Sequence, residues 1–282
     1  MENSLTTLSA SPPLKWPGGK NAFNGKLAKW IISLMPPHLV YVEPYFGGGA
    51  VLLHKDPEGV SEVVNDIYSD LMNFWRVLAQ TPDRMLRELW ATPFSETAFD
   101  AAEQALADTD AVRRATAFFI RCRQSRQGLM KGFTTLSSTR TRGGMNEQVS
   151  AWLTAIEGLP EIHARLKRVV IFNKAALKVI NDNDSVNTLF YLDPPYVTST
   201  RVSKKAYVHE MTQDDHAALL ATLMTIKGKF ILSGYDNEMY ENARSIGNWT
   251  KLETSIVNNA SSKKTKDVKK ECVWLNYTPP QP

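Results

Sequence analysis

An apolar strand that runs into a glycine loop decides the fold of this chain, and its sequence is His38-Leu39-Val40-Tyr41-Val42-Glu43-Pro44-Tyr45-Phe46-Gly47-Gly48-Gly49. The apolar run has the length of a buried strand, and the proline and the three glycines end it. A helix is expected from Ala50, at the end of this loop. Residues 61–65 predict a second strand, which ends at Asp66, and residues 70–79 show helical spacing.

The strand signal disappears in the middle of the chain and then returns. Residues 81–168 are dominated by helical patterns and hold no convincing strand, and residues 134–144 look like an exposed loop. Strands are predicted again at residues 169–172, 188–192 and 230–233, with a helix at 213–226 and an antiparallel edge hairpin at 251–257 and 272–277.

The alternation of strands and helices at both ends indicates an α/β fold with one mostly parallel sheet. We expect residues 1–80 and 169–282 to form this domain, and residues 81–168 to form a helical insert.

The composition is that of a folded globular protein, with 282 residues of which 43% are hydrophobic and 22% charged. Only Cys122 and Cys272 are present, without a CxxC pair, so neither a disulfide scaffold nor a metal site is expected. No segment has the roughly 20 apolar residues that a membrane span needs. These features predict a cytoplasmic protein without a membrane partner.

Basic residues are concentrated in two places, although the net charge is only +4. Residues 111–146 contain eight Lys and Arg and no Asp or Glu, with Phe118, Phe119 and Phe133 between them. Lysines 263, 264, 266, 269 and 270 form a second cluster. A solvated helix face explains either cluster alone, but both together favour a surface that neutralises phosphates of a nucleic acid.

Ligands of open α/β sheets bind beyond the carboxyl ends of the strands, and the first such place here is the glycine loop. Glycines let a ligand lie against the backbone, and Asp66 at the end of the next strand is placed to accept hydrogen bonds from ribose hydroxyls. The loop is neither GxGxxG nor a Walker phosphate loop. We therefore expect a nucleoside-containing ligand, with Glu43, Phe46, Gly47, Gly49 and Asp66 as candidate binding residues.

The second such place is Asp193-Pro194-Pro195-Tyr196, directly after an apolar strand. The prolines fix the chain, so that the Asp193 carboxylate and the Pro194 carbonyl point rigidly into the site, and the Tyr196 ring is available for stacking. Methylation of an aromatic amine requires that its delocalised lone pair be localised. Two acceptors for the amine hydrogens, above a stacked ring, would achieve this.

With these motifs the sequence resembles the Dam-type (D12 class, alpha-group) family of DNA adenine N6 methyltransferases. The order of the motifs and roughly two-thirds of the chain agree with it. The matching segments are Leu14-Lys15-Trp16-Pro17-Gly18-Gly19-Lys20, Val42 to Ala50, Asn65-Asp66-Ile67 with Asp70-Leu71, and Leu192 to Tyr196, with weaker similarity at Ala206-Tyr207, Ile231-Leu232-Ser233 with Asp236, and Ser261 to Lys270.

The resemblance implies a Rossmann-like fold for S-adenosylmethionine-dependent methyltransferases, with a mostly helical target-recognition insert that binds double-stranded DNA. It places Trp16 and Lys20 in the S-adenosylmethionine site, although the residues alone favour core packing for Trp16. It also implies that Asp66 holds the cofactor ribose, that Asp193 contacts the methionine amine and the target amine, and that Tyr196 stacks on an adenine flipped out of the duplex.

The insert departs from the family pattern in its most basic part. Members that recognise GATC have an Asn-Arg-x-Gly-Phe-Asn-Gly-like segment, whereas this chain has Arg123-Gln124-Ser125-Arg126-Gln127-Gly128-Leu129-Met130. GATC specificity is therefore not transferred. Arg123, Arg126 and Arg140 are the candidate DNA contacts, because arginine pairs with guanine edges and with phosphates.

Three alternative functions stay open at this point. The same fold could act on cytosine N4, RNA or a protein amide, although related enzymes with those acceptors favour Ser or Asn in place of Asp193. The chain could also be a DNA-binding regulator that has lost catalysis. A nicotinamide oxidoreductase would share Asp66 but is disfavoured by the missing GxGxxG. A cognate restriction nuclease is equally left open by the sequence.

Overall fold

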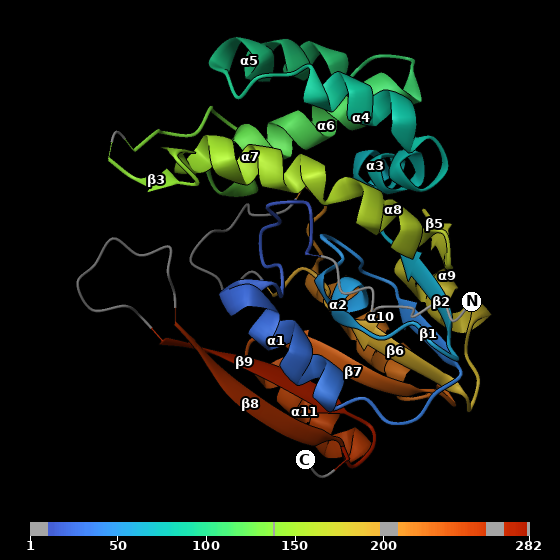
Figure 1. Ribbon diagram of the computed structural model, residues 1–282. Coiled ribbons are helices and arrows are strands. Elements are labelled where there is room, and N and C mark those ends of the chain that lie inside the picture. The colour runs from blue at the N-terminus through green and yellow to red at the C-terminus, as the bar shows by residue number, and fades with distance from the viewer. Residues whose placement is uncertain (1–10, 138, 198–207, 258–267, 281–282) are drawn as a thin grey trace, which may run out of the picture. The chain divides into compact units, whose positions relative to one another are not determined.

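The computed structural model describes residues 11–137, 139–197, 208–257 and 268–280, which form two compact units (Figure 1). Unit 1 comprises Met1–Ile32, Gly47–Glu58 and Tyr68–Asn173, and unit 2 comprises Ser33–Phe46, Gly59–Ile67 and Lys174–Pro282. Most of the lysine cluster and the Ala206-Tyr207 motif lie outside the described residues. None of the described helices is long and apolar enough to cross a membrane.

A mostly parallel sheet forms the core of unit 2, with its strands in the order β2-β1-β6-β7-β9-β8. The first four strands are parallel, and β9 and β8 are antiparallel to their neighbours. The sheet confirms the predicted α/β fold. The strand bounds are β1 Val40–Glu43, β2 Ser61–Asn65, β6 Thr188–Leu192, β7 Lys229–Gly234, β8 Thr250–Val257 and β9 Val268–Leu275.

The central strands of this sheet are almost entirely buried. Every residue of β6 is buried, which explains its continuous apolar sequence, because strands covered on both faces do not alternate. The helices of unit 2 are α9 (Ala176–Asp182), α10 (Gln213–Leu223) and α11 (Glu238–Gly247). Thr212 begins α10 with a capping box, and the Asn237 side chain accepts a hydrogen bond from the Tyr240 amide to begin α11.

The predicted antiparallel pairing near the end of the chain is confirmed, with Leu252 opposite Val273. Its predicted place at the sheet edge holds only for β8. Strand β9 also pairs with β7, so it lies inside the sheet. Burial on both faces suits its sequence, because Cys272, Val273, Trp274 and Leu275 are all wholly buried.

Unit 1 is mostly helical, and α6 lies at its centre, in contact with α3, α4, α5 and α7. Phe118 and Phe119 of α6 are wholly buried and contact the ring of Phe74, while Phe119 also contacts Trp152. The elements are α1 Ala22–Ser33, α2 Ala50–His54, α3 Ser69–Gln80, α4 Pro82–Trp90, α5 Glu96–Ala105, α6 Ala111–Gln124, η1 Arg126–Gly128, α7 Glu147–Glu157, α8 Leu159–Leu166 and β5 Val169–Phe172.

The middle block contains one feature that its sequence did not predict. Thr141–Arg142 (β3) and Met145–Asn146 (β4) pair as a small hairpin, and Gly143 and Gly144 form its turn with φ of 59° and 77°. Both signs are those of a type I′ turn, which glycine adopts readily. Helices from this block group with α2 and α3 in unit 1, and the division at residues 81 and 168 stays a prediction.

Candidate active site

Three carboxylates follow adjacent parallel strands of unit 2. Glu43 is the last residue of β1, Asp66 comes directly after β2, and Asp193 comes directly after β6. These strands are neighbours in the order β2-β1-β6. Since neighbouring strands lie about 4.8 Å apart, the three acidic residues end the strands side by side along one edge. Such an edge suits a ligand with an ammonium group and hydroxyls, and it repels a pyrophosphate.

Glu43 and Asp66 are held in different surroundings. Glu43 is buried, with 2% of its surface exposed, and it accepts a hydrogen bond of 2.7 Å from the Tyr41 hydroxyl. Asp66 is half-buried. Tyr45 lies near Asp66, and burial, together with the charges of Asp215 and Asp66, raises the pKa of its phenol. Tyr45 therefore stays a neutral hydrogen-bond donor at this edge.

Asn65 fixes the turn that follows β1, a role that sequence reasoning missed. Its amide nitrogen donates to the carbonyls of Pro44 and Lys174, each at 3.0 Å, and its Oδ1 accepts from the Lys174 amide at 2.8 Å. The Phe46 amide donates to the Asn65 carbonyl at 2.8 Å. The sequence signal was an asparagine at the end of an apolar strand, and the structure shows that this asparagine is wholly buried.

Tyr196 is almost fully buried after the two prolines, with 7% of its surface exposed. Its hydroxyl donates a hydrogen bond to the carboxylate of Glu271 on β9. Its ring contacts Tyr235, with the centroids 4.6 Å apart and the planes at 71°. Sequence reasoning did not single out Glu271 or Tyr235, because neither belongs to a recognisable motif.

The glycine loop in unit 1 packs against Trp16. A Cβ on Gly47, whose φ is +50°, would lie 2.7 Å from Trp16 Nε1, and a Cβ on Gly48 would lie 2.8 Å from Trp16 Cβ. Trp75 donates its indole N–H to the Gly47 carbonyl at 3.0 Å. These contacts give Trp16 the packing role that the residues alone favour; its predicted contact with the cofactor is not tested by them.

Gly49 and Lys20 are two further candidate residues of unit 1. Gly49 precedes α2 with φ of 70°, and its carbonyl accepts from the Leu53 amide at 3.1 Å. Lys20 is buried, and its ammonium donates to the Gly18 carbonyl at 3.3 Å. Unit 1 thus holds Trp16, Lys20, Gly47 and Gly49, while unit 2 holds Glu43, Phe46, Asp66, Asp193, Pro194 and Tyr196.

The basic residues of the insert are in very different environments. Arg126 is exposed in η1, and Arg140 is exposed but forms an ion pair of 2.9 Å with Glu147. Arg123 is half-buried and donates to the Ala151 carbonyl at 2.6 Å. Arg121 is buried over the ring of Phe99. Arg121, Phe118 and Phe119 belong to the core, so the basic segment at residues 111–146 is only partly available at the surface.

Arg126 lies on a tightly closed loop between α6 and the hairpin. Ser125 is its anchor, since its hydroxyl donates to the Cys122 carbonyl and accepts from the Met130 amide. Gln127 and Met130 have positive φ of 56° and 58°, which non-glycine residues rarely adopt. Gly128 packs so closely that a Cβ there would lie 1.7 Å from the Lys15 carbonyl oxygen.

Lys15 lies beside Arg123 and donates to the Gln148 side chain at 3.3 Å. Burial, followed by the charge of Arg123, lowers the pKa of Lys15 to about 8. The folded state therefore holds fewer protons than the unfolded chain between about pH 8 and 10.5. Its stability rises with pH in that window, and the full cost of the buried charge is present below pH 8.

Replacing this lysine should therefore stabilise the protein at neutral pH. For Lys15→Met we expect a gain of roughly 1 kcal/mol at pH 7 after allowing for solvent screening, or about 2–4 °C in Tm. Thermal melts from pH 7 to 10 should show the gain shrinking as the pH passes 8. Lys131→Met, at an exposed site, is the matched control. A pH-independent gain would assign the effect to packing instead.

The structure defines an α/β protein with three carboxylates at the carboxyl ends of adjacent parallel strands, and comparison with known proteins gives its family. The model of the D12 class N6 adenine-specific DNA methyltransferases matches residues 16–263. The chain belongs to this family. Within the described residues, no cluster of His, Cys, Asp or Glu is arranged to hold a metal ion.

Two similar proteins are type II methyltransferases. M1.LlaDCHI of Lactococcus lactis subsp. cremoris is 25% identical over 286 residues, covering 96% of both chains. M.MjaIII of Methanocaldococcus jannaschii is 23% identical over 297 residues, covering 96% of this chain and all of the relative. The similarity spans nearly the whole length of each protein, so the chain is matched as a whole methyltransferase. Its reaction is the site-specific methylation of adenine in DNA.

Proposed function

We propose that the protein transfers a methyl group from S-adenosylmethionine to the exocyclic N6 amine of an adenine flipped out of duplex DNA. The observation that supports this most is the row of Glu43, Asp66 and Asp193 at the ends of adjacent parallel strands, next to the fixed ring of Tyr196. Membership of the family indicates the reaction. The row of carboxylates provides the groups that would select S-adenosylmethionine as the methyl donor.

The residues fit S-adenosylmethionine better than a dinucleotide. Within unit 2, Asp66 would accept hydrogen bonds from the ribose hydroxyls, and Asp193 from the methionine ammonium. Within unit 1, Lys20, Trp16, Gly47 and Gly49 are the cofactor-binding candidates that the family resemblance implies. Acidic strand ends disfavour a pyrophosphate, which disfavours the nicotinamide alternative. When bound, the sulfonium centre of S-adenosylmethionine supplies an electrophilic methyl group.

Asp193 and Pro194 would prepare the adenine for attack. The Asp193 carboxylate and the Pro194 carbonyl accept the two amine hydrogens, which localises the nitrogen lone pair and aims it at the methyl carbon. Tyr196 supports the base from below by stacking. Asp193 need not remove a proton before attack, because the proton leaves only after the nitrogen has gained its new bond.

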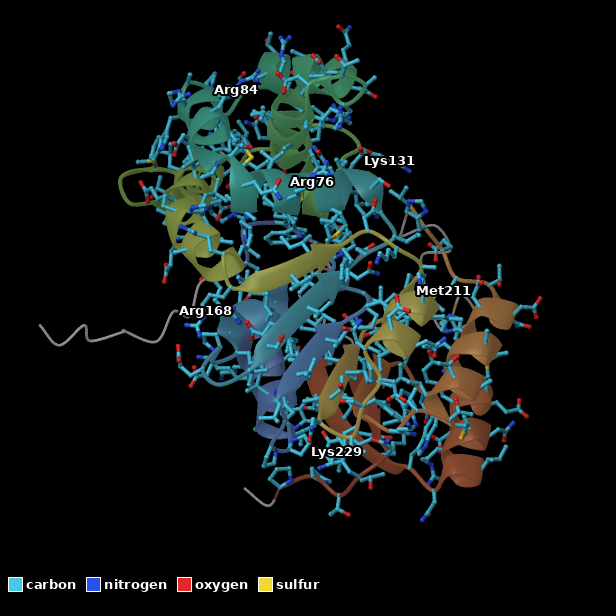
Figure 2. All side chains as sticks on the ribbon, turned by 90° about the vertical axis from the view of Figure 1, so that its right-hand side faces the viewer. Arg76, Arg84, Lys131, Arg168, Met211 and Lys229 are labelled. Atoms are coloured by element: carbon cyan, nitrogen blue, oxygen red, sulfur yellow. The ribbon has the colours of Figure 1, made fainter. Side chains whose placement is uncertain are left out.

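We also propose that residues 81–168 bind the DNA, with Arg126 as the leading contact. Arg126 is exposed on a fixed loop, and Lys131 lies on the same loop with its side chain pointing away from the helices of unit 1 (Figure 2). Arg140 would have to give up its ion pair with Glu147, and Arg123 its bond to Ala151, before either could bind DNA.

Arg126→Ala should weaken DNA binding by about 5- to 20-fold, because one charge-assisted contact is lost, without changing Tm or cofactor affinity. DNA affinity measured over a salt series should lose about one unit of slope. Arg113→Ala is the control, since Arg113 is exposed on α6 but paired with Asp108. Equal loss of cofactor binding in Arg126→Ala would point to a structural role for this loop.

The proposed function is tested by incubating the protein with labelled S-adenosylmethionine and unmethylated genomic DNA, followed by nucleoside analysis and methylation-sensitive sequencing. N6-methyladenine within one recurring motif is the expected result, and it would give the recognition sequence. Label in cytosine, RNA or protein would show that the methyl acceptor is that molecule and not adenine N6. Binding of cofactor and DNA without transfer would favour the regulator. A cognate nuclease, suggested by the type II relatives, would cleave the same motif when unmethylated.

A further inference from the structure

The orientation of the Tyr196 ring depends on more than the two prolines before it. Pro194 and Pro195 restrict the backbone, but the torsions of the Tyr196 side chain remain to be fixed. In the structure its hydroxyl reaches a carboxylate 75 residues further along the chain, that of Glu271. This hydroxyl is therefore directed into the interior of unit 2.

Glu271 is a paired residue of β9. It is opposite Thr254 in the β8–β9 ladder, and the β7–β9 ladder ends one residue away, at the pair Gly234 and Cys272. Tyr235, the residue that contacts the Tyr196 ring, comes directly after the end of β7 at Gly234. The two partners of Tyr196 thus lie close to the point where β7 and β9 stop pairing.

Both groups of the contact between Tyr196 and Glu271 are buried. Glu271 is buried, with 3% of its surface exposed, and a buried carboxylate is costly unless hydrogen-bond donors surround it. Burial, followed by the charges of Asp193 and Glu271, raises the pKa of Tyr196, so its phenol stays a neutral donor. A phenol that donates to a carboxylate forms a charge-assisted hydrogen bond when the carboxylate is ionised.

We propose that Glu271 is a positioning residue for methyl transfer: its carboxylate holds the Tyr196 hydroxyl and thereby sets the plane of the ring on which the target base stacks. Tyr235 limits the motion of the same ring from its side. The inference rests on the proposed stacking role of Tyr196. It assigns the tyrosine hydroxyl to orientation, leaving only the ring to contact the base.

The test compares Glu271→Met, which has similar bulk but no acceptor, with Glu271→Gln, which keeps an acceptor oxygen. For Glu271→Met we expect kcat to fall about 10-fold with little change in the KM for S-adenosylmethionine, since a preorganised contact is lost. Glu271→Gln should restore kcat to within about 3-fold of the original protein. In Tyr196→Phe, which lacks the hydroxyl, adding Glu271→Met should cause no further loss.

A second readout follows the base itself. DNA with 2-aminopurine at the target position, within the motif found by sequencing, should show altered stacking fluorescence with Glu271→Met and normal fluorescence with Glu271→Gln. The control is Glu253→Met, an exposed carboxylate on β8 that is ion-paired with Lys270. It should leave both readouts unchanged.

The outcomes of these experiments distinguish a failure of the Glu271 inference from a failure of the proposed function. Equal losses from Glu271→Met with and without the tyrosine hydroxyl would overturn the inference, as would a Glu271→Gln that is as impaired as Glu271→Met. In both cases the unmodified protein still methylates adenine, so the proposed function stands. An unmodified protein that neither methylates adenine nor changes the 2-aminopurine signal would instead overturn the proposed function.

Discussion

Asp193→Ala should abolish methyl transfer, with kcat at least about 1,000-fold lower, while the protein still folds and binds DNA. The physical reason is that Asp193 would provide one of the two acceptors that localise the lone pair of the amine. Alanine leaves one amine hydrogen without a fixed acceptor at the moment of attack. Single-turnover methylation with saturating S-adenosylmethionine measures the chemical step directly.

The control for this change is Asp182→Ala, which removes an exposed carboxylate paired with Lys178 on α9. It should leave the rate within about 2-fold, as expected for an exposed pair. Thermal melts of both variants establish that folding is intact. Turnover retained by Asp193→Ala would remove Asp193 from the mechanism.

Gly128→Ala should unfold or displace the loop that holds Arg126. A Cβ would lie 1.7 Å from the Lys15 carbonyl oxygen, and the residue has φ of +74°. The clash is with backbone, so it cannot be relieved by rotating a side chain. We expect a loss of about 3 kcal/mol or more, or roughly 6–12 °C in Tm, with weaker DNA binding.

Gly132→Ala separates the two causes of this loss. Gly132 also has a positive φ, +69°, but a Cβ there would meet nothing within 4 Å. Its substitution should cost only the backbone term, about 1–2 kcal/mol. Equal destabilisation by the two substitutions, measured by denaturant unfolding, would mean that the contact with Lys15 is not retained in solution.

The strands of the sheet could be predicted well because burial on both faces leaves a continuous apolar run. Residues 188–192 coincide with β6, and the run at 230–233 lies within β7. Residues 61–65 and 169–172 coincide with β2 and β5, although no residue of β5 is buried. The β3–β4 hairpin was missed because two-residue strands have no periodicity. The inner place of β9 was missed because pairing with two neighbours depends on strand order along the sheet.

The candidate site was predictable only where one short segment contains the chemistry. The carboxylates Glu43, Asp66 and Asp193 follow predicted strands, and parallel strands bring their ends to one edge. Glu271 belongs to no motif, and its contact with Tyr196 forms only when the sheet is complete. The arginines show the same limit. The sequence does not show that Arg121 is buried and Arg126 is exposed, and it does not show which residues each of them contacts.

The geometry of the helix explains why the sequence does not distinguish the environments of the arginines. Arg121 and Arg123 are two positions apart on α6, and so they face different directions. Arg121 packs over Phe99, and Arg123 donates to Ala151. Which direction is the core depends on where α5 and α7 pack, and that information is spread over the whole of unit 1.

The strand order of unit 2 also determines when its sheet can be completed during synthesis on the ribosome. Strand β9 is synthesised after β8 but lies between β7 and β8. Until it emerges from the exit tunnel, β7 keeps an open edge, β8 lacks its neighbour in the sheet, and Tyr196 lacks Glu271. The hydrogen bond between Tyr196 and Glu271 can therefore form only after β9 has been synthesised, about 75 residues later than Tyr196.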